Sequence, residues 1–186
     1  MITDQAKNGI HRIVLNAVQS RLTLEPEDTC HVEQTDMADG GGIDDRDEKG
    51  ERDLVILTIS SLLFRLLVIF QIDDGQETRR YFAREESDSA YQESFAEVAN
   101  LCCGAVNREL LRFFPDLGMS TPYRLKSRGL ALLKEWAPGL LTHFAATING
   151  SVRIGVTVCM IGYAPIDFVF EEDESGATET GELELF

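Results

Sequence analysis

Apolar residues recur at steps of three and four positions in two parts of the chain, which is the pattern of an amphipathic helix. The first part predicts a helix over residues 3–22. The second predicts a long helix that begins after Ser87 or Ser89, either of which can cap it, and runs to about Phe114, where Pro115 stops it. The apolar stripe of the first helix consists of Ile10, Ile13, Val14, Ala17, Val18 and Leu22.

Strand patterns fill much of the remaining chain. A short strand is predicted over residues 30–35. Residues 54–72 are dense in Val, Ile, Leu and Phe, and this predicts two strands joined as a hairpin. After the long helix, residues 119–126 predict one strand and residues 130–136 a short helical turn.

Two turns are marked by their residue types. Asn149-Gly150 separates the apolar runs 142–148 and 152–163, and Asn-Gly at this place predicts a hairpin with a type I′ turn, because both central residues need a positive φ. The turn at residues 73–75 ends in glycine, which we expect to adopt a positive φ there as well.

These elements predict an α+β fold, in which a long amphipathic helix pair packs on one face of a mainly antiparallel sheet. We expect one domain over residues 1–170, with a surface loop over residues 37–52, followed by a tail over residues 171–186. The loop is rich in acids, but it lacks the residue order of a calcium-binding loop, so we predict no metal site in it.

The chain is strongly acidic, with a net charge of -15 and a pI near 4.5. This charge argues against a nucleic-acid partner, because binding phosphates requires a basic surface. Much of the excess lies in the tail, which contains no base, and we expect the tail to be solvated, disordered and dispensable for folding. A regulatory role for it is the alternative. Its acids are Glu171, Glu172, Asp173, Glu174, Glu179, Glu182 and Glu184.

Neither membrane insertion nor secretion is indicated. No apolar stretch approaches the roughly 20 residues that span a bilayer, and the first residues lack a basic region followed by an apolar run. The four cysteines show no CxxC spacing, and two of them are adjacent, which fits neither a disulfide framework nor a zinc site. We therefore predict a cytoplasmic protein. These cysteines are Cys30, Cys102, Cys103 and Cys159.

The long helix carries polar residues on the side opposite its apolar stripe. At about 100° per residue, Glu93, Glu97, Asn100, Gly104 and Asn107 fall within roughly 80° of arc. A glycine inside a helix is less favourable than alanine by about 1 kcal/mol, so its presence on this stripe is consistent with the close approach of another backbone. Spacing alone also fits an ordinary solvated face, because polar pairs three positions apart are common.

Three features follow one another in and after the long helix. They are a Glu-x-x-Asn pattern, a patch of small residues and a proline that opens a strand. This order resembles the CheC/CheX/FliY family of receiver phosphatases, in which an Asp or Ser precedes the Glu by four positions and about twenty-two residues separate the Asn from a Pro. Glu97 and Asn100 match that pattern. Glu93 stands in place of the Asp or Ser, and Pro122 comes one residue early. The resemblance covers about residues 89–163.

The resemblance implies an activity: hydrolysis of the aspartyl phosphate of a CheY-like receiver domain, in chemotaxis or a related two-component pathway. Glu97 and Asn100 are then the catalytic residues. We expect the amide of Asn100 to orient the attacking water, as a glutamine does in GTPases. We expect Glu97 to pair with a lysine of the receiver, which fixes the register of the two proteins.

The resemblance also implies partner contacts and no cofactor in this chain. Glu93, Gly104, Asn107 and Pro122 are the expected partner-binding residues. The receiver is expected to bring its own Mg²⁺. Residues 13–16 read Ile-Val-Leu-Asn where two-site members carry a second Glu-x-x-Asn, so a single-site protein similar to CheX is implied, and with it a possible homodimer.

Two other interpretations stay open. One is a non-catalytic interaction module similar to the FliM middle domain, which would dock on a receiver or a flagellar-switch component. The other is an unrelated structural α+β domain. Covalent catalysis by the chain itself is not indicated, because His11, His31 and His143 fall in unrelated segments and we expect them to be surface or core residues.

Overall fold

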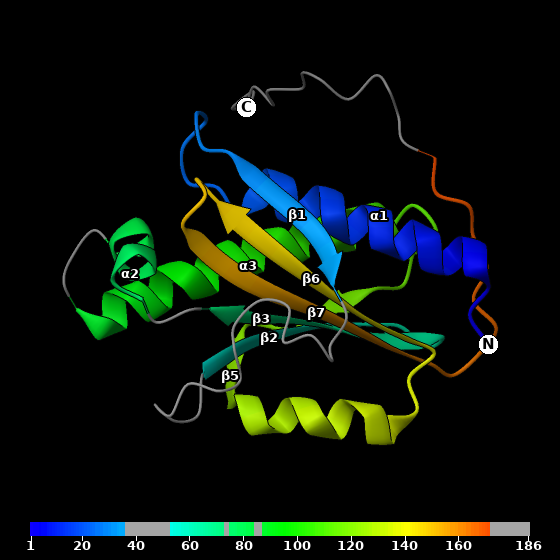
Figure 1. The fold of residues 1–186 in the computed structure, drawn as a ribbon. Helices are drawn as coiled ribbons and strands as arrows, with labels where there is room; N and C mark the ends of the chain where they lie inside the picture. Colours follow the sequence, from blue (N-terminus) through cyan, green and yellow to red (C-terminus); the bar gives the residue numbers. More distant parts are fainter. Residues whose placement is uncertain (36–52, 73–74, 84–86, 172–186) are drawn as a thin grey trace, which may run out of the picture.

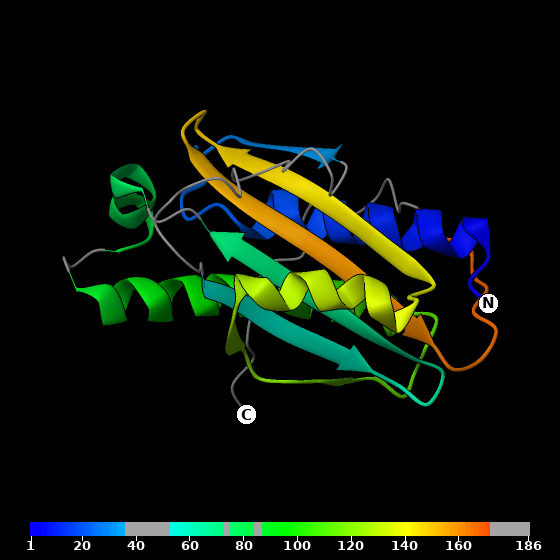
Figure 2. The ribbon, with the colours of Figure 1, turned by 60° about the horizontal axis from the view of Figure 1, so that its bottom comes forward.

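The computed structural model describes residues 1–35, 53–72, 75–83 and 87–171. The strands lie in one sheet, with helices α1 and α3 on one face and the 3-10 helix η2 on the other (Figure 1). Figure 2 looks onto the η2 face, with α1 and α3 behind the sheet. The described residues therefore confirm the α+β class and the helix pair on one face.

Both long helices begin at a hydroxyl side chain that caps them. Thr3 caps α1 (Asp4–Arg21), with its Oγ1 accepting a 3.3 Å hydrogen bond from the backbone N–H three residues later. Ser87 caps α3 (Asp88–Leu110) in the same way, at 3.2 Å. Helix α3 ends at Leu110, earlier than the expected Phe114, and turns carry the chain onward.

The sheet has the order β1-β6-β7-β3-β2-β4, with β5 also paired to β2, and every pair is antiparallel. The strands are β1 (Cys30–Thr35), β2 (Asp53–Ser60), β3 (Phe64–Ile72), β4 (Gly118–Met119), β5 (Tyr123–Lys126), β6 (Leu140–Ile148) and β7 (Val152–Gly162). Both predicted hairpins are confirmed. Asn149 and Gly150 have φ values of 50° and 72°, as a type I′ turn requires.

Several sequence expectations were wrong in detail. A seven-residue helix, α2 (Gln76–Phe82), was not predicted, and its N-cap Gly75 has a φ of -65° instead of a positive one. The single strand expected over 119–126 is two strands, β4 and β5. The expected helical turn is the longer η2 (Ser127–Trp136).

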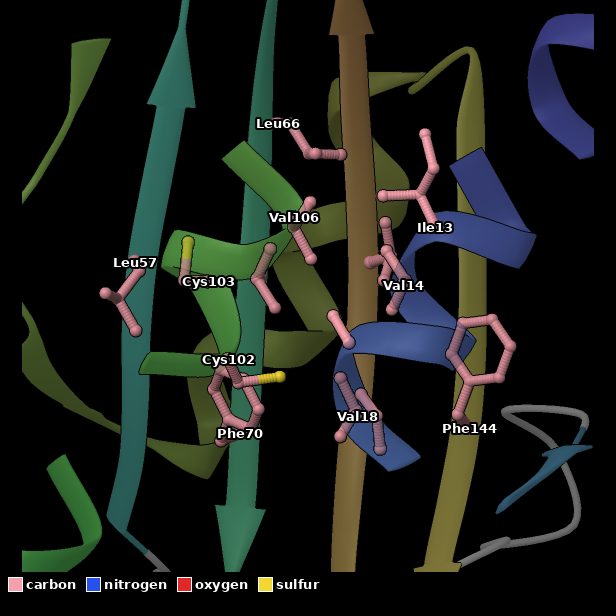
Figure 3. Close-up of a cluster of buried hydrophobic side chains, with 14 of the residues drawn as sticks. Ile13, Val14, Val18, Leu57, Leu66, Phe70, Cys102, Cys103, Val106 and Phe144 are labelled. Atoms are coloured by element: carbon pink, nitrogen blue, oxygen red, sulfur yellow. The ribbon is translucent and has the colours of Figure 1, made fainter. Parts of the chain in front are cut away.

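The core lies between the helix pair and the sheet (Figure 3). The apolar stripe of α1 and the small buried residues of α3 meet β2, β3, β6 and β7 there. Because side chains alternate along a strand, the other face of the sheet also carries apolar residues. These pack against Leu133 of η2 and form a second, smaller cluster of Leu54, Ile56, Leu67, Ile69, Leu133 and Cys159.

The segment after β7 returns to the start of the chain. Ile2 and Ile166 form a parallel bridge, with Thr3 N–H bonded to the Ile166 carbonyl at 3.1 Å and Ile166 N–H to the Met1 carbonyl at 3.0 Å. Alternate residues from there, Ile166, Phe168 and Phe170, are buried. This segment therefore joins the core.

The predicted loop over 37–52 and the predicted tail over 171–186, apart from Glu171, lie outside the described residues. Among the helices that the structure describes, none combines the length and apolar character needed to cross a bilayer.

Candidate functional site

The core fixes how α3 is turned about its axis. Its buried residues form one side of the helix, and they include Cys102, Val106 and Leu110, each fully buried. With that side held against the sheet, Glu93 and Glu97 are exposed and Asn100 is half-buried. The structure therefore places Glu97 and Asn100 on the outward side of α3.

Gly104 lies one turn beyond Asn100, and the space in front of it is open. A Cβ atom built on Gly104 meets no atom within 4 Å. Leu101, which the sequence interpretation did not single out, is 55% exposed on the same outward side. The sequence carried a signal for this exposure, because Leu101 is an apolar residue that lies off the buried stripe of the helix. Together Glu97, Asn100, Leu101 and Gly104 form what we call the α3 outer face.

Asn107 differs from the expectation of a plainly exposed residue. Its side chain is half-buried, and its Oδ1 atom is buried with no hydrogen-bond partner in the part of the chain that the structure describes. A buried acceptor without a partner is unfavourable by about 1–3 kcal/mol. Asn107 is therefore not the solvated contact residue that the sequence predicted.

Pro122 lies in a β-bulge at the edge of the sheet. Residues 120–122 stand opposite only two residues of β2, since Met119 pairs with Ile59 and Tyr123 with Ile56. Ser120 holds the bulge, because its Oγ accepts a 3.0 Å hydrogen bond from Thr58 N–H. Proline suits this place because it donates no hydrogen bond to a ladder.

The strand after the bulge lies beside the first turns of α3. Arg124 of β5 donates a hydrogen bond to Oε1 of Gln92, the residue before Glu93. This bond places Gln92, the chain neighbour of Glu93, beside the strand that follows Pro122.

Helix α1 carries no second site of the same type. Ile13, at the place where a second Glu would be needed, is 1% exposed and belongs to the core. Asn16 is exposed. That α3 carries the single Glu-Asn site of this chain stays a prediction.

The buried cysteines are poor nucleophiles. Burial raises the pKa of Cys103 to about 12 and that of Cys159 to about 11, and burial, followed by the neighbouring Cys103, raises the pKa of Cys102 as well. A thiol attacks as its thiolate, which these environments disfavour. All four cysteines are free thiols.

Two histidines have contacts in the sheet. His11 Nε2 lies 2.6 Å from Thr142 Oγ1, and His143 Nδ1 lies 2.7 Å from Thr157 Oγ1. Both threonines are buried. Within the described residues no group of three or more His, Cys, Asp or Glu side chains could hold a metal ion.

The α3 outer face offers a carboxylate from Glu97, an amide from Asn100 and an apolar contact from Leu101.

The fold is similar to those of solved chemotaxis proteins. CheX from Vibrio vulnificus has a TM-score of 0.50 at 12% identity, over 82% of this chain and 97% of that chain. A CheX-CheY-BeF3-Mg²⁺ complex from Borrelia burgdorferi gives 0.51 at 11%, over 83% and 96%. CheX from Desulfovibrio desulfuricans gives 0.51 at 9%, over 81% and 98%.

The sequence itself matches no model of a known protein family and no curated protein. At identities this low, the likeness concerns the fold alone, and it covers 81–83% of this chain. The chain therefore has the α+β fold of the CheX chemotaxis proteins.

Proposed function

We propose that this chain hydrolyses the aspartyl phosphate of a response-regulator receiver domain. The observation that carries the proposal is the placement of Glu97 and Asn100 one turn apart on the outward side of α3, while the opposite side is fixed in the core. A rigid helix can insert a carboxylate and an amide into a partner's site together, in one orientation.

Each residue has a distinct role in this proposal. Hydrolysis of an aspartyl phosphate needs a water held in line with the phosphorus, and the amide of Asn100 can accept from and donate to that water. The carboxylate of Glu97 pairs with a lysine of the receiver and fixes the register. Leu101 and Gly104 allow the partner to come close, the first by apolar contact and the second by leaving open space.

Glu93 and Pro122 extend the proposed contact surface toward the sheet edge, and Asn107 extends it toward the end of α3. The CheX of Borrelia burgdorferi forms a complex with CheY, BeF3 and Mg²⁺. By analogy, the phosphorylated receiver is the proposed partner of this chain, and it brings the Mg²⁺ that neutralises the phosphoryl oxygens. The proposed place of action is the cytoplasm. A homodimer stays a prediction.

The proposal is tested with receivers encoded in the same genome. Each is phosphorylated with a small phosphodonor, the donor is removed, and the loss of phosphate is followed with a substoichiometric amount of this chain. We expect one receiver to lose its phosphate at least about ten times faster than alone, because positioned water and charge together lower the barrier by more than about 1.4 kcal/mol. Unchanged decay of every receiver would overturn the proposal.

A further inference from the structure

A cleft of about 320 Å³ lies between helices α1 and α3, away from the Glu97-Asn100 pair. Apolar and cationic residues line it together, and the cationic ones come from both helices and from the turn after α3. They are Ile13, Ala17 and Ala105, with Arg21, Arg108 and Arg112. The cleft is therefore both apolar and basic.

Positive charge gathered in one place is unusual for this chain, which has 32 acidic residues and 17 Lys and Arg. Glu109 also lines the cleft and pairs with Arg112 at 3.0 Å. Arg21 and Arg108 are exposed, and no ion pair joins either of them to another of the described residues. Each lies in the last turn of its helix, where a cation interacts favourably with the helix dipole. The dipole does not explain why both arginines face the same cleft.

The described chain ends at this cleft. Phe170 lines it, and its ring lies 6.0 Å from the guanidinium carbon of Arg12. Phe170 also packs on Gly9, since a Cβ atom there would stand 3.1 Å from Phe170 Cβ. Four acids, at positions 171–174, follow directly in the sequence. Four extended residues span about 13 Å, and α1 rises about 12 Å from Ile13 to Arg21, so these acids are long enough to run along the cleft.

We propose that the acidic C-terminal tail, residues 171–186, binds in this cleft of its own chain through the acids at positions 171–174. Opposite charges meet there, and the tail is tethered at the cleft by Phe170. A short tether gives an effective concentration in the millimolar range, so a tail that binds weakly still occupies the cleft ahead of a separate acidic partner. The inference concerns this chain alone, and none of its tests uses a receiver.

Exposed ion pairs contribute little to folding free energy, so the melting temperature is not a useful measure of this binding. The direct measurement is the order parameter of the backbone amides at positions 171–174, obtained by NMR relaxation on the full chain. At low salt we expect values near the rigid limit of about 0.85, and at about 0.5 M NaCl we expect them to fall below about 0.6 as the charges are screened.

Charge reversal separates the cleft from general electrostatics. In the full chain, R21E/R108E should release the tail and lower the order parameters at low salt to the high-salt values. The control is R153E, which reverses one exposed arginine of β7 outside the cleft and changes the net charge half as much. It should leave the tail ordered. Combining R21E/R108E with E171R/E174R restores opposite charges and should restore order.

Three results would overturn the proposal. Tail amides that are equally mobile in the unmodified chain, R21E/R108E and R153E would show that the tail does not bind. Equal loss of order in R153E and R21E/R108E would show a response to net charge alone. Order that falls on dilution of the protein would show that the tail binds a second copy of the chain. Amide shifts in the sheet check that each variant is folded.

Discussion

Gly9 and Phe168 are packed so closely that a Cβ atom on Gly9 would lie 2.8 Å from Cε2 of the phenylalanine ring. The same ring also packs against Phe113, at 4.5 Å between centroids, and against Phe114, at 5.5 Å. A glycine in the middle of α1 therefore lets the segment after β7 pack against the helix backbone and reach α3. This contact places the last described residues beside the helix pair.

Replacing Gly9 should reveal this contact in the free energy of unfolding. Gly9→Leu forces a side chain into the space of Phe168, and overpacking of this kind lowers stability by about 1–3 kcal/mol, more than the gain in helix propensity of about 1 kcal/mol. Urea unfolding measures the change. Gly104→Leu is the matched control, because it gives the same gain in propensity with nothing within 4 Å, and it should not lower stability. Equal effects at both glycines would contradict the packing.

His11 should make stability depend on pH near neutrality. Burial, and then the charge of Lys7, lower the pKa of His11 below its ordinary value of 6.5. Below pH 6.5 the unfolded chain therefore takes up a proton that the folded chain does not, so the free energy of unfolding falls as the pH drops from about 6.5 toward the lower, folded-state pKa.

The difference between variants isolates this histidine. His11→Gln keeps a polar group near Thr142 but cannot titrate, so its unfolding free energy should fall less between pH 7 and pH 5 than that of the unmodified chain. The inference about His11 is wrong if both proteins lose the same free energy of unfolding between the two pH values in urea titrations.

Elements whose signals are local could be predicted from the sequence. The hairpin at Asn149-Gly150 follows from residue types that accept a positive φ. The extent of α1 follows from the apolar period, which predicts a helix over residues 3–22. The outward direction of Glu97 follows from the same period, since the buried stripe fixes the opposite side of α3.

Features that depend on distant contacts could not be predicted. Helix α2 is short and polar, and its position relies on Tyr81 donating a 2.6 Å hydrogen bond to Asp28 and on Phe82 packing against Phe95 at 5.3 Å. The break before β5 depends on Ser120 bonding to β2. The burial of the Asn107 side chain likewise depends on what packs beside α3. The helical period alone predicts on which side of the helix Asn107 lies, but not how buried it is.

Gly104 should tolerate substitution in the fold but not in the proposed complex. Gly104→Ala should raise the free energy of unfolding by about 0.5–1 kcal/mol, because alanine is the better helix former and the site is open. Gly104→Arg should fold, yet lose binding to the phosphorylated receiver by at least about tenfold, a measurable 1.4 kcal/mol, since its side chain fills the space that the partner needs. Titration calorimetry measures the affinity.

A matched control adds the same charge elsewhere. Ser151→Arg places an arginine on the exposed turn between β6 and β7, and it should bind the receiver like the unmodified chain. Normal binding by Gly104→Arg would show that the docking surface is not the α3 outer face.

The two residues of the Glu-Asn pair should separate in kinetics, because their proposed roles differ. Asn100→Ala removes the amide that orients water, so the dephosphorylation rate at saturating chain should fall by about 10² or more, with little change in affinity. Glu97→Ala removes a charge-assisted contact, so affinity should weaken by about 1–3 kcal/mol while the saturated rate changes less. Single-turnover decay of the phosphorylated receiver, measured against the concentration of this chain, gives both quantities.

Matched variants control for loss of a similar side chain at exposed positions elsewhere in the chain. Asn8→Ala on α1 and Glu33→Ala on β1 should leave both rate and affinity unchanged. Asn100→Ala and Glu97→Ala should each change the free energy of unfolding by less than about 1 kcal/mol, since both residues lie on the outward side of α3. An unfolded Asn100→Ala would mean that this amide holds the structure together, and the catalytic assignment would fail.

If the unmodified chain binds the phosphorylated receiver without accelerating its decay, the chain is an interaction module, because binding alone does not lower the barrier to hydrolysis.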